Sequence, residues 1–439
     1  MKTSAITSGQ KRRGGAATGV LRLAFVFALV PVLTTQGVLA GGIENVDHSA
    51  RSMGMGGSMV TAGDDPTVIH LNPAALAFLT GTNFSLGSTV MLPELSFTGA
   101  APGSLETKMQ PQVIFPPDLY LSHTFGESWG MGIAIHEPYS TRTEWTPDWI
   151  GSRLVTKSDI RVLMVTPSLG MRVRKNLAVG LGLNIVFPKV LYERRIPLAH
   201  GNFGAPIPDG YATYEESGDV SVGVQAGLVW KPSSSVTLGA ACRSRIGLDM
   251  DNGQVSFRSI PDSLAAQFVQ QRYVSSFVLP TQIQAGLSWQ PLDWIVVSSD
   301  IEYSWWSQIT SIVVTYPNSR WLTQTIQAGW RNTVNSRSGL ELLFGDVALR
   351  AGYRIEDSPI PDRTFLPGIP DAAGNGYTLG FGYRVAEGLV LDFAYMFLRY
   401  GDRHVTNSLF AYDGNGDLLN GTYISKTTAI ALNVLYTWK

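Results

Sequence analysis

The chain has 439 residues, of which only 15% are charged and 44% are hydrophobic, and its mean hydropathy is +0.08. Soluble domains usually carry about 25% charged residues, so this composition favours a β-barrel whose outer surface faces lipid. The formal net charge of −1 becomes about −6 without the basic first forty residues, which argues against a nucleic-acid partner. The single Cys242 excludes an internal disulfide.

The first forty residues have the pattern of an export signal. A basic leader without acidic residues precedes the apolar run Leu23–Leu33, and the small-residue site Val38-Leu39-Ala40 fits cleavage before Gly41. The apolar run is shorter than the roughly 20 residues that a membrane-spanning helix needs. We therefore predict a signal peptide over residues 1–40, with an uncleaved anchor as the alternative.

Residues 41–81 do not alternate as strands do. Glycine, alanine and serine are mixed with methionine, and the steps Asp64-Asp65-Pro66 and Asn72-Pro73-Ala74 follow. Asp65 and Asn72 each stand where a helix cap is expected, with proline at the first helical position. The segment predicts short helices and compact turns, small enough to plug a barrel formed by residues 82–439.

The clearest strand is the last one. From Ala429 to Trp438, apolar and aromatic residues alternate with small or polar ones. This period-two pattern is the strand signature, and an apolar face that ends in aromatics is typical of lipid contact. Similar segments predict an antiparallel barrel of 14 strands, an even number as in bacterial barrels. They cover residues 82–91, 118–125, 130–137, 159–173, 177–191, 219–230, 236–248, 273–289, 294–303, 324–344, 346–355, 375–385, 389–400 and 423–438.

Short turns such as Arg174–Asn176 and Ala386–Gly388 predict tight periplasmic hairpins, set against longer extracellular loops. One long loop is expected at about Glu193–Gly218. In a second, Asp262 or Ser263 can cap a short helix with an apolar side. Apolar residues in exposed loops mark a binding surface, or else they pack together as a lid. Both interpretations stay open.

No set of residues with the pattern of an enzyme or metal site stands out. The six histidines lack metal-ligand spacing, and Asp413–Asp417 resembles the start of a calcium loop but has Ile424 where an acidic ligand is needed. An outer-membrane hydrolase would need an inward Ser beside His123 or His136, and none stands out. We expect no catalysis, no cofactor and no metal. A diffusion porin or an adhesin remain alternatives.

Further motifs follow the N-terminal segment in a fixed order. With the two N-terminal steps, the set is Asp64-Asp65-Pro66, Asn72-Pro73-Ala74, Leu279-Pro280, Asp300, Trp305-Trp306-Ser307, Arg350-Ala351-Gly352-Tyr353, Ser358-Pro359-Ile360-Pro361-Asp362 and Pro370-Asp371. This ordered set resembles the FadL family of outer-membrane transporters over nearly all of the chain after residue 40. Two departures are Lys439 after the terminal Trp438 and Ala372-Ala373-Gly374, where members often carry polar or basic residues.

This resemblance implies a monomeric barrel in the outer membrane of a Gram-negative bacterium, among outer-membrane lipids and lipopolysaccharide. In the family, extracellular loops capture a hydrophobic small molecule such as a long-chain fatty acid. The molecule moves to a pocket in the barrel, and movement of the N-terminal plug, the hatch, opens a lateral exit at a kink in the third strand. An uptake channel for aromatic hydrocarbons with the same mechanism is the alternative.

The resemblance and the residue types give three groups of candidate site residues. The hatch and gating group is Asp64, Asp65, Asn72, Pro73 and Ala74. The substrate-binding group is Met53, Met55, Met59, Ile69, Leu71, Leu76, Phe78, Leu79, Phe203, Leu264 and Phe268; at least half of its hatch members are expected only to anchor the plug. The lateral-opening group is Gly130, Gly132 and Pro138, since glycine within a strand marks a bulge or a close backbone approach.

A fatty-acid carboxylate would need a buried Arg or Lys. The sequence does not select one. The candidates near the expected region are Arg153, Lys157, Arg161 and Lys189, each of which is also readable as a loop or rim charge.

Overall fold

A computed structural model describes residues 44–45, 49–198, 208–318, 323–411 and 418–438. The chain divides into two compact units between Gly37 and Val38, and only the second is described. The predicted signal peptide lies outside the described residues. In the described ranges, no helix combines the length and the apolar character needed to cross a membrane.

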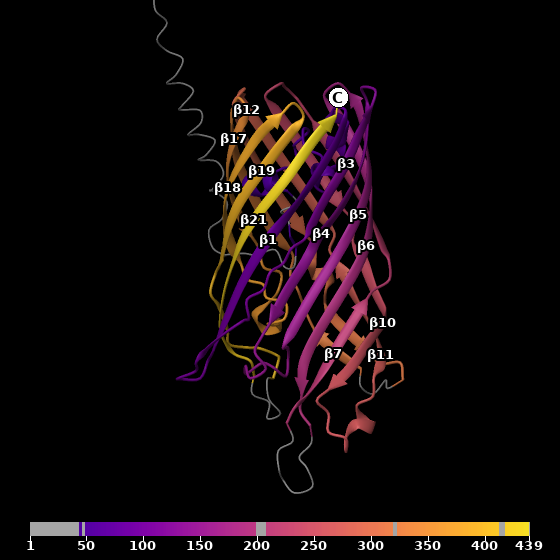
Figure 1. The fold of residues 1–439 in the computed structure, drawn as a ribbon, viewed down its shortest axis with the longest axis vertical. Helices are drawn as coiled ribbons and strands as arrows, with labels where there is room; N and C mark the ends of the chain where they lie inside the picture. Colours follow the sequence, from indigo (N-terminus) through magenta and orange to yellow (C-terminus); the bar gives the residue numbers. More distant parts are fainter. Residues whose placement is uncertain (1–43, 46–48, 199–207, 319–322, 412–417, 439) are drawn as a thin grey trace, which may run out of the picture. The chain divides into compact units, whose positions relative to one another are not determined.

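Fourteen strands of the described chain form one closed antiparallel ring (Figure 1). The ring closes because β21 pairs with β1 from Thr82↔Trp438 to Gly99↔Gly421. This confirms the predicted barrel and its strand number. The ring strands, in order, are β1 (Thr82–Gly99), β3 (Pro117–Phe125), β4 (Trp129–Glu144), β5 (Lys157–Arg174), β6 (Leu177–Ile196), β8 (Ser221–Trp230), β9 (Val236–Arg243), β12 (Gln282–Leu292), β13 (Ile295–Ser304), β16 (Thr333–Phe344), β17 (Val347–Glu356), β18 (Gly374–Ala386), β19 (Leu389–Tyr400) and β21 (Gly421–Trp438).

Alternation along each strand separates a lipid face from a lumen face. On β21, Leu432 is 62% exposed whereas its neighbour Ala431 is fully buried. On β18, Leu379 is exposed and Thr378 is buried. Apolar side chains therefore point outward into lipid, and small or polar ones point into the lumen, as the period-two pattern predicts.

Three predicted strands were wrong as single units. Residues 236–248, 273–289 and 324–344 each break into two strands, at Ser244-Arg245, at Pro280-Thr281 and at residues 328–332. Pro280 cannot donate to a ladder, which favours a break there. The predicted loop at about 193–218 also contains a strand. The strands outside the ring are β2 (Glu106–Lys108), β7 (Gly210–Ser217), β10 (Ile246–Arg258), β11 (Gln271–Leu279), β14 (Ser311–Thr315), β15 (Gln324–Gln327) and β20 (Arg403–Val405).

Most of these extra strands prolong one side of the wall beyond the ring. β6 pairs with β8 near its start and with β7 over Lys189–Ile196, and the series continues through β10, β11, β14 and β15 (Figure 1). We call this end of the barrel the loop end and the opposite end, with the short hairpins such as 175–176 and 387–388, the turn end. Because β5 and β6 have 18 and 20 residues and about 9–11 cross a membrane, these strands project beyond it.

The N-terminal segment contributes three short helices, which contact the lumen face of the ring. They are α2 (Ala50–Gly54), α3 (Val68–Leu71) and η1 (Pro73–Phe78); further 3-10 turns outside the hatch are η2 (Ala265–Gln267), η3 (Trp306–Gln308) and η5 (Asp362–Thr364). The Ser49 hydroxyl caps α2 by accepting from the Ser52 amide at 3.0 Å. Asn72 caps η1 with Pro73 at its start, as predicted. The predicted start at Pro66 is wrong, since α3 begins at Val68.

Inward glycines make room for these helices. A Cβ atom at Gly180 on β6 would lie 2.3 Å from the Ala74 amide nitrogen, and one at Gly227 on β8 would lie 2.0 Å from Oδ1 of Asn72. Any side chain at either position would collide with the hatch. The small lumen face read from the sequence is therefore the surface on which the hatch packs.

Candidate functional site in the barrel lumen

Asn72 joins the hatch to the wall. Its fully buried side chain donates from Nδ2 to the Val60 carbonyl at 2.9 Å and to the Leu228 carbonyl of β8 at 3.1 Å. Its Oδ1 accepts from the Ala74 amide at 3.2 Å. One side chain therefore holds two parts of the hatch and a barrel strand together, while Pro73 and Ala74 pack on the inward glycines.

The two predicted gating carboxylates have different surroundings. Asp64 is largely exposed and pairs with Arg51 at 3.0 Å. Asp65 is buried and accepts from the Thr67 amide at 2.9 Å, so it shapes the turn before α3 without capping that helix. Burial raises the pKa of Asp65 above its ordinary value. Arg51 also binds Glu341 of β16 at 2.9 Å, which adds an ion-pair anchor between hatch and wall.

The apolar hatch candidates pack against the wall in separate places. Met53 lies against Met91 and Met396, and Phe78 lies between the cations Arg172 and Lys231. The others form two small clusters. The first is Met55, Met59 and Leu71 with Val60, and the second is Ile69, Leu76 and Leu79 with Tyr120 and Ala134. The structure does not gather the eight into one pocket, and a substrate role for them stays a prediction.

A large apolar cluster fills the loop end of the lumen. The indole rings of Trp145 and Trp149 stack with centroids 4.3 Å apart, and Trp306 lies 5.3 Å from Trp330. We call this set the loop-side apolar cluster. Its aromatic members are Phe97, Tyr139, Trp145, Trp149, Trp306, Trp330, Phe365 and Tyr423. Trp306 belongs to a motif of the family resemblance, but none of the eight was among the predicted substrate-binding residues.

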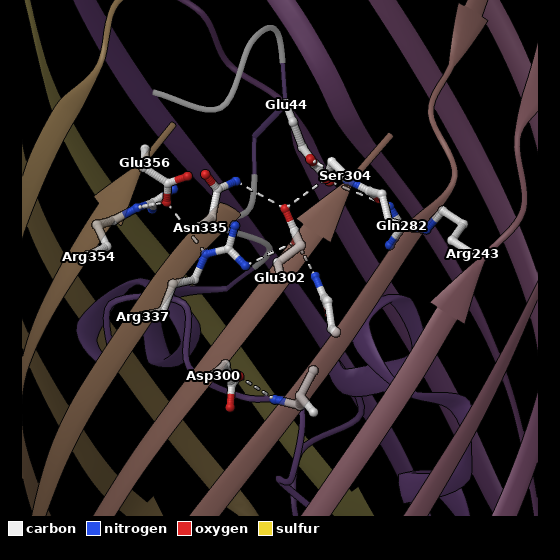
Figure 2. A network of polar contacts seen from close by, with 12 residues as sticks. Glu44, Arg243, Gln282, Asp300, Glu302, Ser304, Asn335, Arg337, Arg354 and Glu356 are labelled. Atoms are coloured by element: carbon white, nitrogen blue, oxygen red, sulfur yellow. Dashed lines mark hydrogen bonds and ion pairs between the residues drawn. The ribbon is translucent and has the colours of Figure 1, made fainter. Parts of the chain in front are cut away.

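Buried charges line the lumen near this cluster (Figure 2). Arg337 of β16 donates to Glu302 of β13 at 3.1 Å and lies 3.5 Å from Glu356 of β17, which also accepts from Arg354 at 2.6 Å. Arg243 of β9 completes the set. All of these strand side chains point inward. The sequence feature that could have identified them is a charged residue on the small or polar face of a strand.

Glu44 brings a third carboxylate into this network. Its Oε2 accepts from Gln282 Nε2 at 2.6 Å, and its Oε1 lies 3.5 Å from Arg243 Nη1. The Tyr139 hydroxyl contacts both Arg243 and Gln282 at 3.3 Å. Glu44 belongs to the N-terminal segment and not to a membrane-spanning strand. Burial, together with the nearby Glu302, raises the pKa of Glu44 to about 8.

The third ring strand, β4, is irregular. Its register against β5 shifts between His136 and Tyr139, which places Glu137 and Pro138 in a bulge. Pairing with β3 ends at Asp118↔His136, so β4 continues toward the loop end without that neighbour. Gly130 and Gly132 are not the site of the bulge. They allow close approach of the hatch, since a Cβ at Gly130 would lie 2.1 Å from the Leu76 carbonyl oxygen.

A loosely bonded segment fills the gap between β1 and β4 beyond this point. Met109 donates from its backbone to Leu95 of β1 at 2.8 Å, Gln110 donates to Glu144 of β4 at 2.7 Å, and Ile114 bridges to Met91. Glu44 and Asn45, the N-terminal strap, lie beside β4: Glu44 bridges to Tyr139, and the Asn45 amide donates to the Pro138 carbonyl at 2.7 Å. We call this part of the wall the seam.

Two cavities accompany these features. One of about 110 Å³ adjoins the seam and is lined by Glu44, Met91, Leu95, Met109, Ile114 and Met396 among others. A second of about 530 Å³ lies at the turn end and is lined largely by polar and charged residues, including Arg51, Asp64, Lys231 and Glu341. The larger one suits water better than an apolar ligand. Ligand sites commonly measure about 300–1,000 Å³, so the cavity at the seam is too small for a long chain as it stands.

The loop candidates lie near the loop end, beyond the ring. Leu264 and Phe268 pack on a cluster with Ile196 and Tyr273, which supports the lid interpretation for them. The predicted capped helix at 263–269 is wrong: η2 has no side-chain cap, and Val269 is 61% exposed, away from that cluster. Phe203 and most of the calcium-like loop, residues 412–417, lie outside the described residues.

The basic residues suggested for a carboxylate are at the rim. Arg153 pairs with Asp209, Lys157 with Glu144, and Arg161 with Asp159. Lys189 lies on the exposed side of β6. Buried cations that face the lumen in the described part of the chain include Arg243, Arg337, Arg350 and Arg354.

The fold and the lumen together define a transmembrane β-barrel plugged by an N-terminal hatch, with a packed apolar cluster at its loop end. A family model described as "Outer membrane protein transport protein (OMPP1/FadL/TodX)" matches residues 31–438. The chain therefore belongs to this family of outer-membrane transport proteins.

Individual relatives are distant in sequence and close in fold. Outer membrane protein P1 of Haemophilus influenzae is 21% identical, over 85% of this chain and 89% of its own length. A long-chain fatty acid transport protein of Escherichia coli is 22% identical, over 83% and 87%. The crystal structure of a Pseudomonas aeruginosa FadL homologue superposes with a TM-score of 0.80 at 20% identity, covering 91% of this chain and 100% of that one. The Pseudomonas putida toluene transporter TodX gives 0.66 at 19% identity, with 92% and 99% covered.

Proposed function

We propose that this protein takes up long-chain fatty acids across the outer membrane without doing chemistry on them. The loop-side apolar cluster is the observation that carries this proposal. It places eight aromatic side chains in the lumen, where a polar-solute pore would need water. Buried arginines beside it suit a ligand with an apolar chain and a carboxylate. The name of the Escherichia coli relative, a long-chain fatty acid transport protein, agrees with this substrate class, and the name of the Haemophilus relative agrees with the outer membrane.

We also propose a role for each segment of the chain. Residues 1–40 are a cleaved export signal, residues 41–81 are the movable hatch, and residues 82–439 are the barrel. Asp64, Asp65 and the Asn72-Pro73-Ala74 step hold the hatch in its closed position. The barrel works as a monomer among outer-membrane lipids and lipopolysaccharide.

The exit that we propose is lateral, through the seam beside β4. The bulge at Pro138 lies where the pairing between β3 and β4 ends, and the segment that fills the gap makes few backbone hydrogen bonds. A wall held by few bonds opens at lower cost than a continuous ladder. An apolar ligand leaving there would enter the lipid directly and would not cross water.

Aromatic hydrocarbons are the second candidate class of substrate. The fold is also similar to that of a toluene transporter, and the apolar cluster alone does not distinguish an aromatic ring from an alkyl chain. The buried arginines favour a carboxylate, because a hydrocarbon gives them no acceptor.

The test is uptake of radiolabelled oleate, with toluene in parallel, by cells that lack their own transporter. The full chain is compared with a version that lacks residues 43–79. Oleate uptake that the deletion changes supports a hatch-gated fatty-acid carrier. Toluene uptake alone keeps the mechanism and changes the substrate class. Passage of small sugars without either compound contradicts the proposal and indicates a diffusion porin.

A further inference from the structure

The cradle around the Glu44 carboxylate is built from three separate barrel strands. Arg243 comes from β9, Gln282 from β12 and Tyr139 from β4, and all three side chains are buried. Gln282 and Arg243 face the two carboxylate oxygens at 2.6 and 3.5 Å (Figure 2 shows Glu44, Gln282 and Arg243). The Tyr139 hydroxyl donates to Gln282 Oε1 and accepts from Arg243 Nη1. An amide N–H and a guanidinium that converge on two oxygens form a carboxylate site.

The charges in this part of the lumen need such a carboxylate. Within ion-pair distance, the cations Arg243, Arg337 and Arg354 face the carboxylates of Glu44, Glu302 and Glu356. Only Glu44 comes from outside the barrel wall. If it left, Arg243 would remain buried without an anionic partner, which is costly in a low-dielectric interior. Another carboxylate would restore the balance.

Spare donors are present at the same place. In the described part of the chain, buried Nε of Arg243 and Nη2 of Arg337 donate no hydrogen bond. Buried donors in proteins are nearly always satisfied, so these atoms mark a place where a further acceptor is accommodated. The cradle therefore retains an unused donor, Nε of Arg243, for a further acceptor.

Glu44 and its neighbour Asn45, the N-terminal strap, also hold β4 in the barrel wall. While Glu44 reaches into the cradle, the Asn45 side chain donates to the Ser140 hydroxyl at 2.6 Å and its backbone amide donates to Pro138. Both acceptors belong to the part of β4 that β3 no longer covers. Withdrawal of Glu44 thus removes the neighbour of β4 at its bulge.

Apolar space for a chain lies directly beside the cradle. Met91, Leu95, Met109, Ile114 and Leu398 line the 110 Å³ cavity at the seam, together with Glu44 itself. Release of the strap would enlarge this cavity from the side where its carboxylate had been. A ligand with its carboxylate at Arg243 could then place its chain along the seam.

We propose that Arg243, Gln282 and Tyr139 form the carboxylate site of the transporter. Glu44 occupies this site when no ligand is bound. The carboxylate of a long-chain ligand replaces Glu44 and thereby frees the N-terminal strap from β4. This inference rests on the proposed function. The closed state is then self-inhibited by a carboxylate of its own chain, and the ligand that needs transport also loosens the wall.

Two properties favour the exchange. The ligand adds the burial of its alkyl chain, which Glu44 does not have. Glu44 is also held at a cost, because burial and Glu302 disfavour its charged form, as its raised pKa indicates. Because docking of Glu44 carries this cost, Glu44 competes weakly for the site. It occupies the site in the absence of ligand, and a ligand of moderate affinity can displace it.

The first test compares oleate with oleyl alcohol, which has the same chain and no carboxylate, for binding to the purified full-length protein in detergent micelles. We expect Glu44→Ala to bind oleate about tenfold more tightly than the wild type, because the side chain that occupies the site has been removed, with no change for the alcohol. Arg243→Gln should lose oleate affinity to a similar extent and keep the alcohol. Glu127→Ala, at an exposed turn, is the matched control.

The second test is hydrogen exchange of the peptide that contains residues 138–144. Oleate should speed its exchange in the wild type, oleyl alcohol should not, and Glu44→Ala should exchange fast without ligand. This readout does not depend on the folding of the Arg243 variant. The inference is overturned if oleate binds equally to wild type and Glu44→Ala, or if exchange at β4 is the same in both. If the wild type binds neither compound, the proposed function fails as well.

Discussion

The carboxylate of Asp300 on β13 accepts a hydrogen bond from the backbone amide of Val60 at 2.9 Å. The carboxylate lies inside the barrel wall and the amide belongs to the hatch (Figure 2 shows Asp300 below the charge network). The Ser298 hydroxyl donates to the Ser58 carbonyl at 3.0 Å, two residues before Val60. β13 thus holds the hatch by its backbone at Val60, whose carbonyl also accepts from Asn72 Nδ2.

Replacing Asp300 with alanine should loosen the hatch. The Val60 amide would lose its acceptor in a buried place, which costs about 1–3 kcal/mol. We expect faster hydrogen exchange over residues 58–62 and greater entry of a small polar antibiotic into cells. Asp293→Ala, at the exposed turn before β13, is the control. Unchanged exchange in the Asp300 variant would show that this bond does not hold the hatch.

A methyl group at Gly180 should displace the hatch. The added Cβ would lie 2.3 Å from the Ala74 nitrogen, whereas at Gly247 on β10 nothing lies within 4 Å. Overpacking of this kind costs about 1–3 kcal/mol, so Gly180→Ala should unfold at lower denaturant concentration and Gly247→Ala should not. Equal midpoints for the two variants would contradict the close packing of hatch on wall.

Glu341 should be far more important for stability than its surface counterparts. It accepts from Arg350 at 2.7 Å and from Arg51 of the hatch at 2.9 Å, and it is buried. Glu341→Gln would leave buried cations with too little negative charge, at a cost of about 3–5 kcal/mol. Asp346→Asn, in the exposed pair with Arg384, should cost less than about 1 kcal/mol. Thermal unfolding of both variants measures the difference.

The N-terminal strap should leave its cradle more readily as the pH rises. The docked Glu44 carboxyl has a pKa of about 8, against an ordinary value of 4.5, so the docked state binds its proton more tightly than the released strap does. Docking is therefore favoured at low pH, and its advantage falls as the pH rises from about 4.5 through 8. The charged groups that face Glu44 are Arg243, Arg337 and Glu302.

The measurement for this prediction is hydrogen exchange at residues 138–144, corrected for the intrinsic pH dependence of exchange. Corrected exchange should increase from pH 5 to pH 8 in the wild type and stay flat in Glu44→Gln. A rise of the same size in both proteins would assign the effect to another group.

The comparison of sequence with structure separates two kinds of information. The direction in which strand side chains face, with Leu432 outward and Ala431 inward, was predictable from the sequence. Alternation depends only on the order of neighbouring residues. The Asn72 cap was predictable for the same reason. The Asp65 start was wrong because its side chain bonds to Thr67 without beginning a helix there. The breaks at Ser244 and Pro280 were missed because they occur where strands leave the ring for the loop end.

The carboxylate site was not predictable from the sequence. Arg243 and Glu44 are separated by about 200 positions, and nothing local in either segment indicates the other. The basic residues that the sequence suggested for binding a carboxylate, such as Arg153 and Arg161, form ion pairs with aspartates at the rim of the barrel. The missed arginines carried one usable signal, a charge on the lumen face of a strand.

The sequence by itself determined the barrel, its plug and its lipid face, because hydrophobic periodicity, short turns and capping residues act over a few positions along the chain. Only the tertiary structure decided which inward side chains meet across the lumen, where β4 loses its neighbour, and that Glu44 reaches Arg243. Closure of the ring sets those distances, since strand stagger and hatch position bring together groups whose separation in the chain carries no information about their separation in space.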